Sequence, residues 1–211
     1  MRENLECHRV PRNVVTIPWS AKAPDNPQET HLRLRRVFML DVKKIPMKIG
    51  YYLAGFADGE GSLMVIFRKR NDYENGWKVS VAFNVSNKDK VILALFKRYL
   101  KCGTLRQRKD GVWYYEVSNF NAIVENVIPF FERFRFLSAV KKNSFSKFKK
   151  VVEIIKNSEH TTKEGIEKIL SLRNQMNKDA SKRKHTDEEI LNDLGEDPQR
   201  PYAEHHMGMT P

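Results

Sequence analysis

The clearest pattern in the chain is a strict alternation of apolar and polar residues over residues 77–87. Apolar side chains recur at every second position, at Trp77, Val79, Val81, Phe83 and Val85. Successive side chains of a strand point to opposite faces of a sheet, so this pattern predicts a strand with one buried face. Residues 63–70 alternate in the same way, and Asn75-Gly76 between the two stretches is the favoured dipeptide of a tight hairpin turn.

The same pattern returns in a shorter form further along the chain. Residues 104–109 and 112–118 are predicted strands, and Asp110-Gly111 between them predicts a second hairpin turn. Residues 88–101 carry apolar side chains at helical spacing and are closed by Gly103, so a helix is expected between the two hairpins. Within the second hairpin, the sequence leaves open whether Trp113, Tyr115 and Val117 face the core or the opposite side.

The rest of the chain after the second hairpin is predicted to be helical. Residues 120–136 form a helix with a break at Pro129, because proline cannot donate the helical hydrogen bond. Three more helices follow, two of them opened by the capping-box patterns Thr161-x-x-Glu164 and Thr186-x-x-Glu189, over residues 144–157, 162–177 and 187–194.

Small residues interrupt an apolar stretch over residues 51–62 and predict a helix that another segment approaches closely. Gly55 and Gly59 lie four apart on one face, which allows close packing between helix backbones. Gly59 and Gly61 are expected to end the helix in the left-handed cap conformation. Glu60 then lies at the helix C-terminus, where the partial negative charge of the helix favours a cation beside the carboxylate. Unpaired carbonyls together with a carboxylate form an oxygen site suited to Mg²⁺.

These elements predict an α+β fold of the order αββαββα, with a four-stranded antiparallel sheet and C-terminal helices. One face of the sheet would be covered by helices and the other would be polar and basic. We expect this domain to cover residues 47–195, after a poorly structured N-terminal extension over residues 1–46 and before a disordered tail over residues 196–211. Met47 is a possible start of the functional protein. The extension is interrupted by Pro11, Pro18, Pro24, Pro27 and Pro46.

The charge balance indicates a polyanionic partner. Lys and Arg number 38 against 26 Asp and Glu, which gives a formal charge of +12. Cys7 and Cys102 form neither a metal-binding spacing nor a disulfide framework, which fits a reducing compartment. No apolar run approaches the roughly 20 residues that a membrane span needs, so we expect no membrane partner.

Residues 53–61, Leu-Ala-Gly-Phe-Ala-Asp-Gly-Glu-Gly, resemble the signature of the LAGLIDADG homing endonucleases. The resemblance implies an intron-encoded, site-specific DNA endonuclease that makes a metal-dependent double-strand break at a long pseudo-palindromic site. It implies that the Glu60 carboxylate and the Gly59 carbonyl bind Mg²⁺ or another divalent cation. Many relatives have Asp at this position, and Glu keeps the charge but moves it by one methylene. Such an enzyme would act in the bacterial cytoplasm or in the stroma or matrix of an organelle.

The resemblance also assigns roles to residues outside the signature. Asn87 would position the attacking water, and its alternative role is to cap the helix that follows. Lys141 would stabilise the charged phosphate, with Lys142 as its close rival. Because the chain carries a single signature, the resemblance implies a homodimer. Its interface would include Leu53, Gly55, Phe56 and Gly59. Binding to double-stranded DNA is expected through sheet residues Arg68, Arg70, Lys78, Ser80, Asn84, Thr104, Arg106 and Arg108.

Other functions share the expected fold or the basic charge. One is an RNA maturase that binds its intron RNA and assists splicing, and another is a non-catalytic DNA-binding regulator. A ribosomal or RNA-binding module would explain the charge but not Gly-Glu-Gly at a helix end. Glu60, Asn87 and Lys141 together favour the nuclease.

Overall fold

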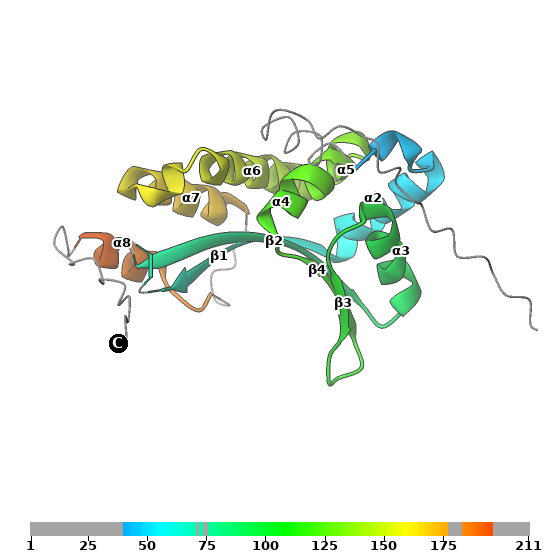
Figure 1. Ribbon diagram of the computed structural model, residues 1–211, viewed down its shortest axis with the longest axis horizontal. Coiled ribbons are helices and arrows are strands. Elements are labelled where there is room, and N and C mark those ends of the chain that lie inside the picture. Colours follow the sequence, from blue (N-terminus) through cyan, green and yellow to red (C-terminus); the bar gives the residue numbers. More distant parts are fainter. Residues whose placement is uncertain (1–39, 71, 74–75, 177–182, 196–211) are drawn as a thin grey trace, which may run out of the picture. The chain divides into compact units, whose positions relative to one another are not determined.

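Four antiparallel strands form a single sheet in the order β1-β2-β4-β3 (Figure 1). The computed structural model describes residues 40–70, 72–73, 76–176 and 183–195. The four-stranded antiparallel sheet confirms the predicted fold class. The strands are β1 (Gly61–Lys69), β2 (Trp77–Asn87), β3 (Thr104–Gln107) and β4 (Trp113–Val117).

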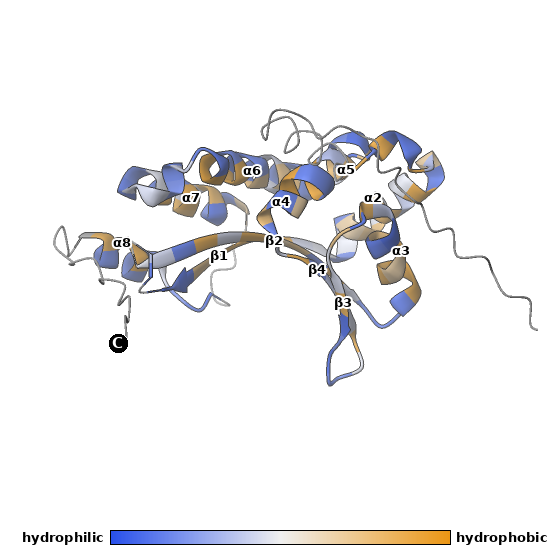
Figure 2. Cartoon of the chain, in the orientation of Figure 1, coloured by the Kyte–Doolittle hydropathy of each residue, from blue (hydrophilic) through white to orange (hydrophobic). Residues whose placement is uncertain are grey.

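Alternation of side chains gives the sheet one buried face. Leu63 pairs with Phe83, and Val65 pairs with Val81, so the apolar rows of β1 and β2 lie side by side. Phe83 in turn pairs with Val117, and Tyr115 is fully buried. The structure thereby settles the orientation of β4: Trp113, Tyr115 and Val117 face the core. The loop between β3 and β4 is hydrophilic and extends away from the helices (Figures 1 and 2).

Helices cover this buried face (Figure 1). In chain order they are α2 (Met47–Glu60), α3 (Lys90–Leu100), α4 (Phe120–Ala122), α5 (Ile128–Arg133), α6 (Ala139–Lys156) and α7 (Lys163–Met176). Phenylalanine rings fill the space between helices and sheet, and Phe131 contacts both Phe83 (5.2 Å between ring centroids) and Phe136 (4.4 Å). The core is therefore built mainly from aromatic side chains, which bury large apolar areas.

The predicted break at Pro129 is wrong. The chain stays helical from α4 to α5, and the irregular segment Ile123–Val127, a π-helix, precedes the proline. Pro129 lies in the first turn of α5 and cannot donate to the Glu125 carbonyl four residues earlier. The Leu40 N–H donates to that carbonyl instead (3.3 Å).

That hydrogen bond also shows that ordered structure begins before Met47. Leu40 and Ile45 are buried in the core, and Val42–Lys44 form a short 3-10 helix. The expected unstructured extension therefore does not include residues 40–46. Residues 1–39 and the predicted tail 196–211 lie outside the described residues.

Two predicted helix starts are also corrected. Helix α6 begins at Ala139 rather than at residue 144, because the Ser138 side chain accepts the Lys141 N–H and caps it. Helix α7 is capped by Thr162 rather than Thr161, since Thr162 Oγ1 accepts the Gly165 N–H (3.1 Å). Among the described residues, no helix is long and apolar enough to cross a membrane.

Candidate active site and nucleic-acid interface

Glu60 is the last residue of α2, and its side chain is exposed. The expected left-handed cap is wrong: Gly59 lies within the helix, and Gly61 is extended, with φ −78°. Glycine is needed at 61 for space, because a Cβ there would lie 2.5 Å from the Ala57 carbonyl oxygen. This close approach lets the chain pass directly from α2 into β1, and so fixes Glu60 at the edge of the sheet.

The end of α2 offers oxygen ligands. The Gly61 N–H donates to the Ala57 carbonyl, and the chain then leaves the helix, so no helical N–H follows to pair with the Gly59 carbonyl. Within the described part of the chain, no three His, Cys, Asp or Glu side chains gather to hold a metal. One carboxylate with backbone carbonyls fits a hard cation such as Mg²⁺, which retains several of its own waters. The helix C-terminus favours such a cation electrostatically.

Lys141 lies beside this site, although it is far away in the sequence. Its Nζ donates a hydrogen bond to the Gly61 carbonyl (2.6 Å), next to Glu60. Burial lowers the pKa of Lys141, and the Asp58 and Glu60 carboxylates oppose that shift. Lys142 is exposed, so the geometry favours Lys141 over its rival.

Asn87 ends β2 at the same end of the sheet. Gly61, the first residue of β1, pairs with Val85, so Asn87 lies two residues past this pair. Asn87 does not cap α3, as its alternative role required. Its Oδ1 accepts the Asp89 N–H (2.8 Å), and Asp89 is the capping residue. The Asn87 Nδ2 group takes no part in that hydrogen bond.

The open face of the sheet is less uniformly basic than predicted. In β1 and β2, Met64 pairs with Ala82 and Ile66 with Ser80, so apolar residues lie along its centre. Arg68 pairs with Lys78 at one end of that face. The residues on this face are Ser62, Met64, Ile66, Arg68, Lys78, Ser80, Ala82, Asn84, Ser86, Thr104, Arg106, Tyr114 and Glu116.

The four arginines do not share one face as predicted. Arg68 and Arg106 lie on the open face, but Arg70 and Arg108 lie beyond the strand ends. Arg70 forms a two-point ion pair with Asp72 (2.7 Å for each contact), and Arg108 pairs with Asp110 (3.0 Å). Alternation holds only while a strand continues, so it could not place side chains in the turns.

A polar network that the sequence did not reveal occupies the open face beside the candidate active site. Asn84 Nδ2 donates to the Tyr114 hydroxyl (3.1 Å), which donates to Glu116 (3.4 Å). Arg106 donates to the other oxygen of Glu116 (2.8 Å). Because Trp113 faces the core, alternation along β4 puts Tyr114 and Glu116 on the open face. The sequence did not reveal these two residues because it left the orientation of β4 undecided.

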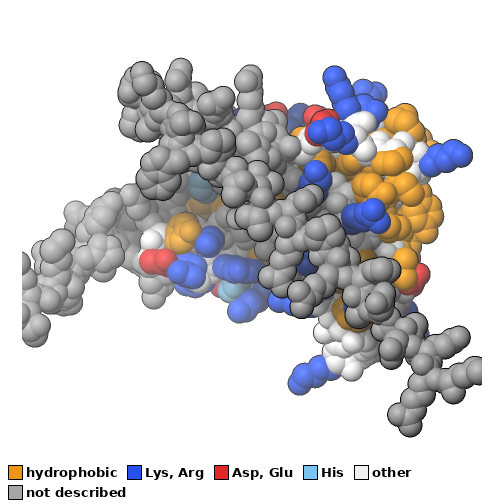
Figure 3. All heavy atoms as spheres, turned by 45° about the vertical axis from the view of Figure 1, so that its right-hand side comes forward, with side chains coloured by type: hydrophobic (Ala, Val, Ile, Leu, Met, Phe, Trp, Pro, Cys, Tyr) orange, Lys and Arg blue, Asp and Glu red, His pale blue; other side chains and the backbone are white. Residues whose placement is uncertain are grey.

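The outward face of α2 is apolar and exposed. Met47, Tyr51 and Tyr52 are about half exposed (50%, 49% and 57%). Within the part of the chain that the structure describes, a Cβ added at Gly55 or Gly59 would meet nothing within 4 Å. Figure 3 shows a region of apolar side chains on the side of the molecule where α2 and α3 lie. Two expected interface residues face inward instead: Leu53 is fully buried, and the half-buried Phe56 packs on Phe96.

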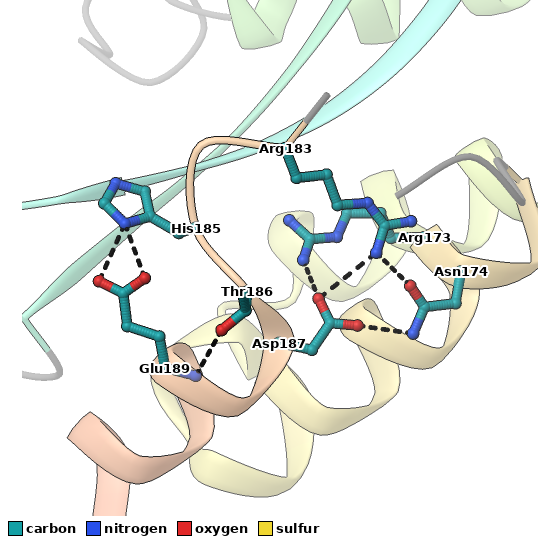
Figure 4. Close-up of polar contacts among 7 residues, drawn as sticks. All are labelled: Arg173, Asn174, Arg183, His185, Thr186, Asp187 and Glu189. Carbon is teal, nitrogen blue, oxygen red and sulfur yellow. Dashed lines mark hydrogen bonds and ion pairs between the residues drawn. The ribbon is translucent and has the colours of Figure 1, made fainter. Parts of the chain in front are cut away.

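Helix α8 (Asp187–Gly195) and the residues just before it contact the turn end of the β1–β2 hairpin, where Lys69 pairs with Asp193 and Trp77 contacts His185. Arg173 of α7 contacts Asp187, and Asn174 also donates to Asp187 (Figure 4). Arg173 also lies over the Phe67 ring (4.7 Å). Thr186 Oγ1 accepts the Glu189 N–H (3.1 Å), which confirms the predicted cap. The Glu189 carboxylate contacts His185 rather than completing a capping box (Figure 4).

Comparisons with known proteins identify the class that this fold and site define. The sequence profile described as LAGLIDADG endonuclease matches residues 53–152. DNA endonuclease I-CeuI of Chlamydomonas moewusii is 30% identical over 152 residues, which are 69% of this chain and 70% of that protein. The chain belongs to the LAGLIDADG endonuclease family.

Other similar proteins differ in length. Probable intron-encoded endonuclease 2 of Neurospora crassa is 31% identical over 63% of this chain, but the match spans only 28% of that protein. The structure of I-SmaMI bound to cleaved DNA has a TM-score of 0.60 at 30% identity. The match covers 69% of this chain and 47% of the I-SmaMI chain. The homing endonuclease I-TnaI has a TM-score of 0.59 at 26% identity, and 96% of its chain is covered. This chain therefore matches one part of some relatives and nearly the whole of others.

Proposed function

We propose that the protein is a site-specific DNA endonuclease of the intron-homing type that cuts both strands of a long pseudo-palindromic site as a homodimer. The observation that carries the proposal is the convergence of Glu60, Lys141 and Asn87 at the end of α2, where the open face of the sheet begins. The similar proteins named as DNA endonucleases, and the DNA-bound structure of I-SmaMI, support it.

Each residue of the site has a distinct chemical role in this proposal. Glu60 and the Gly59 carbonyl hold a divalent cation, for which Mg²⁺ fits the oxygen ligands. When bound, such a cation stabilises charge on the phosphate and lowers the pKa of a bound water. Asn87 orients the attacking water through its amide. Lys141 offers its ammonium group to the negative charge that develops on the phosphate.

The open face of the sheet reads the DNA. A strand ribbon fits the major groove, where base edges present a sequence-specific pattern of donors and acceptors. Arg106 is held by Glu116 (2.8 Å), so its remaining N–H groups have a fixed direction. Arg68, Lys78, Ser80, Asn84 and Thr104 are further candidates on the same face. Arg70 and Arg108, paired in the turns, are better suited to phosphate contacts.

Dimerisation follows from the number of carboxylates. Each protomer supplies one Glu60, whereas cutting two strands requires two metal-bound centres. Packing two α2 helices through Gly55 and Gly59 across a two-fold axis brings both Glu60 side chains together. A two-fold symmetric protein would recognise a similarly symmetric site.

The test uses Glu60→Gln, which removes the charge and keeps the size. The variant protein is used to select duplex sites from a randomised library, since it should bind DNA without cutting it. With Mg²⁺, the wild type should then cleave the selected sites in both strands, and the variant should not. Glu167→Gln on α7 removes another exposed carboxylate, away from the site, and should cleave normally.

The outcomes separate the proposal from its alternatives. Normal cleavage by Glu60→Gln would remove the proposed role of this carboxylate. A wild-type protein that binds a selected site but leaves it intact would be a DNA-binding regulator. If the variant selects no duplex and the wild type instead accelerates splicing of an intron RNA, the maturase function replaces the nuclease.

A further inference from the structure

We propose that Asp58, the first acidic residue of the signature, is a positioning residue that holds Lys141 at the active site. The inference rests on the proposed function and assigns a role that Glu60 cannot perform. Asp58 lies on α2 and Lys141 on α6, 83 positions later in the sequence. A direct link between these two helices is therefore needed to fix the distance from the Lys141 ammonium to Glu60.

The link is a set of hydrogen bonds at the start of α6. Asp58 Oδ2 accepts the N–H groups of Leu137 (3.0 Å) and Ser138 (2.8 Å). Its Oδ1 accepts the Ser138 hydroxyl proton. Ser138 Oγ in turn accepts the Lys141 N–H (3.2 Å) as the cap of α6. The Asp58 carboxylate thus connects α2 to the first turn of α6 through three donors.

Lys141 completes a closed ring of contacts. Its Nζ returns to the end of α2 and donates to the Gly61 carbonyl (2.6 Å). The ring runs from Asp58 through Ser138 and Lys141 to Gly61. Glu60 lies between Asp58 and Gly61 in the chain, so the ring encloses the end of α2 that carries it. If the link at Asp58 is cut, the first turn of α6 is free to move, and Lys141 moves with it.

Electrostatics supports the same arrangement. A carboxylate at a helix N-terminus is stabilised by the helix dipole, so Asp58 is well placed at the start of α6. Burial alone would raise the pKa of Asp58, but the hydrogen bonds from Ser138 and Leu137 and the Lys141 charge hold it below its usual value. With both its oxygens engaged, Asp58 is a poor metal ligand, which leaves Glu60 as the metal-binding carboxylate.

Asp58 could instead serve stability alone, and a double-mutant cycle distinguishes the two roles. Single-turnover cleavage at saturating DNA and Mg²⁺ is measured for Asp58→Ala, Lys141→Ala and the double variant. Lys141→Ala should lower the rate on the order of 100-fold, the scale of removing one transition-state donor. Asp58→Ala should lower it to a similar extent. The double variant should be no slower than Lys141→Ala, because both changes remove the same interaction.

Two further variants serve as controls. Asp58→Asn keeps the shape and can still accept the backbone N–H groups, so it should restore most of the rate. Asn119 caps α4, where its Oδ1 accepts the Ala122 N–H (3.0 Å), and it does not contact Lys141. Asn119→Ala removes a helix cap elsewhere in the fold and should leave the saturated cleavage rate unchanged.

A readout without cleavage completes the test. A crystal structure of metal-free Asp58→Ala should show the Lys141 side chain away from the Gly61 carbonyl. If Asp58→Ala does not fold, Ser138→Ala, which cuts the same link at its next residue, replaces it in the cycle. Additive losses in the cycle, or an unmoved Lys141, would overturn the positioning role. A wild type that does not cleave would instead overturn the proposed function.

Discussion

The inward and outward faces of α2 both carry glycine, in different surroundings. On the inward face, a Cβ added at Gly50 would lie 2.2 Å from the Phe134 ring. On the outward face, a Cβ added at Gly55 or Gly59 would meet none of the described residues within 4 Å. Glycine inside a helix costs about 1 kcal/mol relative to alanine. At Gly50 the packing against Phe134 explains this cost, whereas no contact among the described residues explains it at Gly55 and Gly59.

The difference supports the proposed homodimer. Exposed tyrosines and a methionine beside two bare stretches of backbone suit close helix packing, as the proposed homodimer requires. Leu137 and Val140, at the start of α6, are also highly exposed (81% and 77%). Exposed apolar side chains therefore also occur beyond the signature helix.

The largest expected effect comes from Gly55→Leu. The side chain should be accommodated in the protomer, because no described residue lies within 4 Å of a Cβ at Gly55, but it would hold two α2 helices apart. We expect a monomer in analytical ultracentrifugation and no double-strand cleavage, with the unfolding free energy of the monomer not reduced. A variant that still sediments as a dimer and cleaves DNA would remove α2 from the interface.

A smaller effect is expected for Gly50→Ala, and it acts on the stability of the protomer rather than on the dimer. The added methyl collides with a fully buried ring, so the protein should be destabilised by about 1–3 kcal/mol, the usual cost of overpacking. Urea unfolding followed by circular dichroism measures this change. An unchanged unfolding midpoint would mean that the Phe134 ring moves easily. Packing would then not explain the glycine at position 50 on the inward face.

The smallest effect is expected for Gly59→Ala on the outward face. Alanine should stabilise the isolated protomer by about 0.5–1 kcal/mol through helix propensity alone. The same methyl should weaken self-association. Unfolding measured at low protein concentration, together with a dimer dissociation constant, tests both parts. A destabilised protomer would show that the outward glycines are needed within the chain itself.

Local patterns in the sequence determined much of this protein. Alternation over residues 77–87 gave β2 with the same ends as in the structure, because burial of one face repeats with the period of a strand. The signature gave α2 and put Glu60 at its end. In both cases the deciding interactions lie within the element or between neighbours in the chain.

Tertiary structure decided what depends on distant contacts. The sequence could not show that Leu40 supplies the N–H that Pro129 withholds from Glu125, so the helix break was expected. It could not orient β4, and therefore missed Tyr114 and Glu116. It also left Lys141 and Lys142 as rivals, since only the packing of α6 against α2 brings Lys141 to Gly61. These outcomes depend on pairs of residues far apart in the chain, and no local period encodes such a pair.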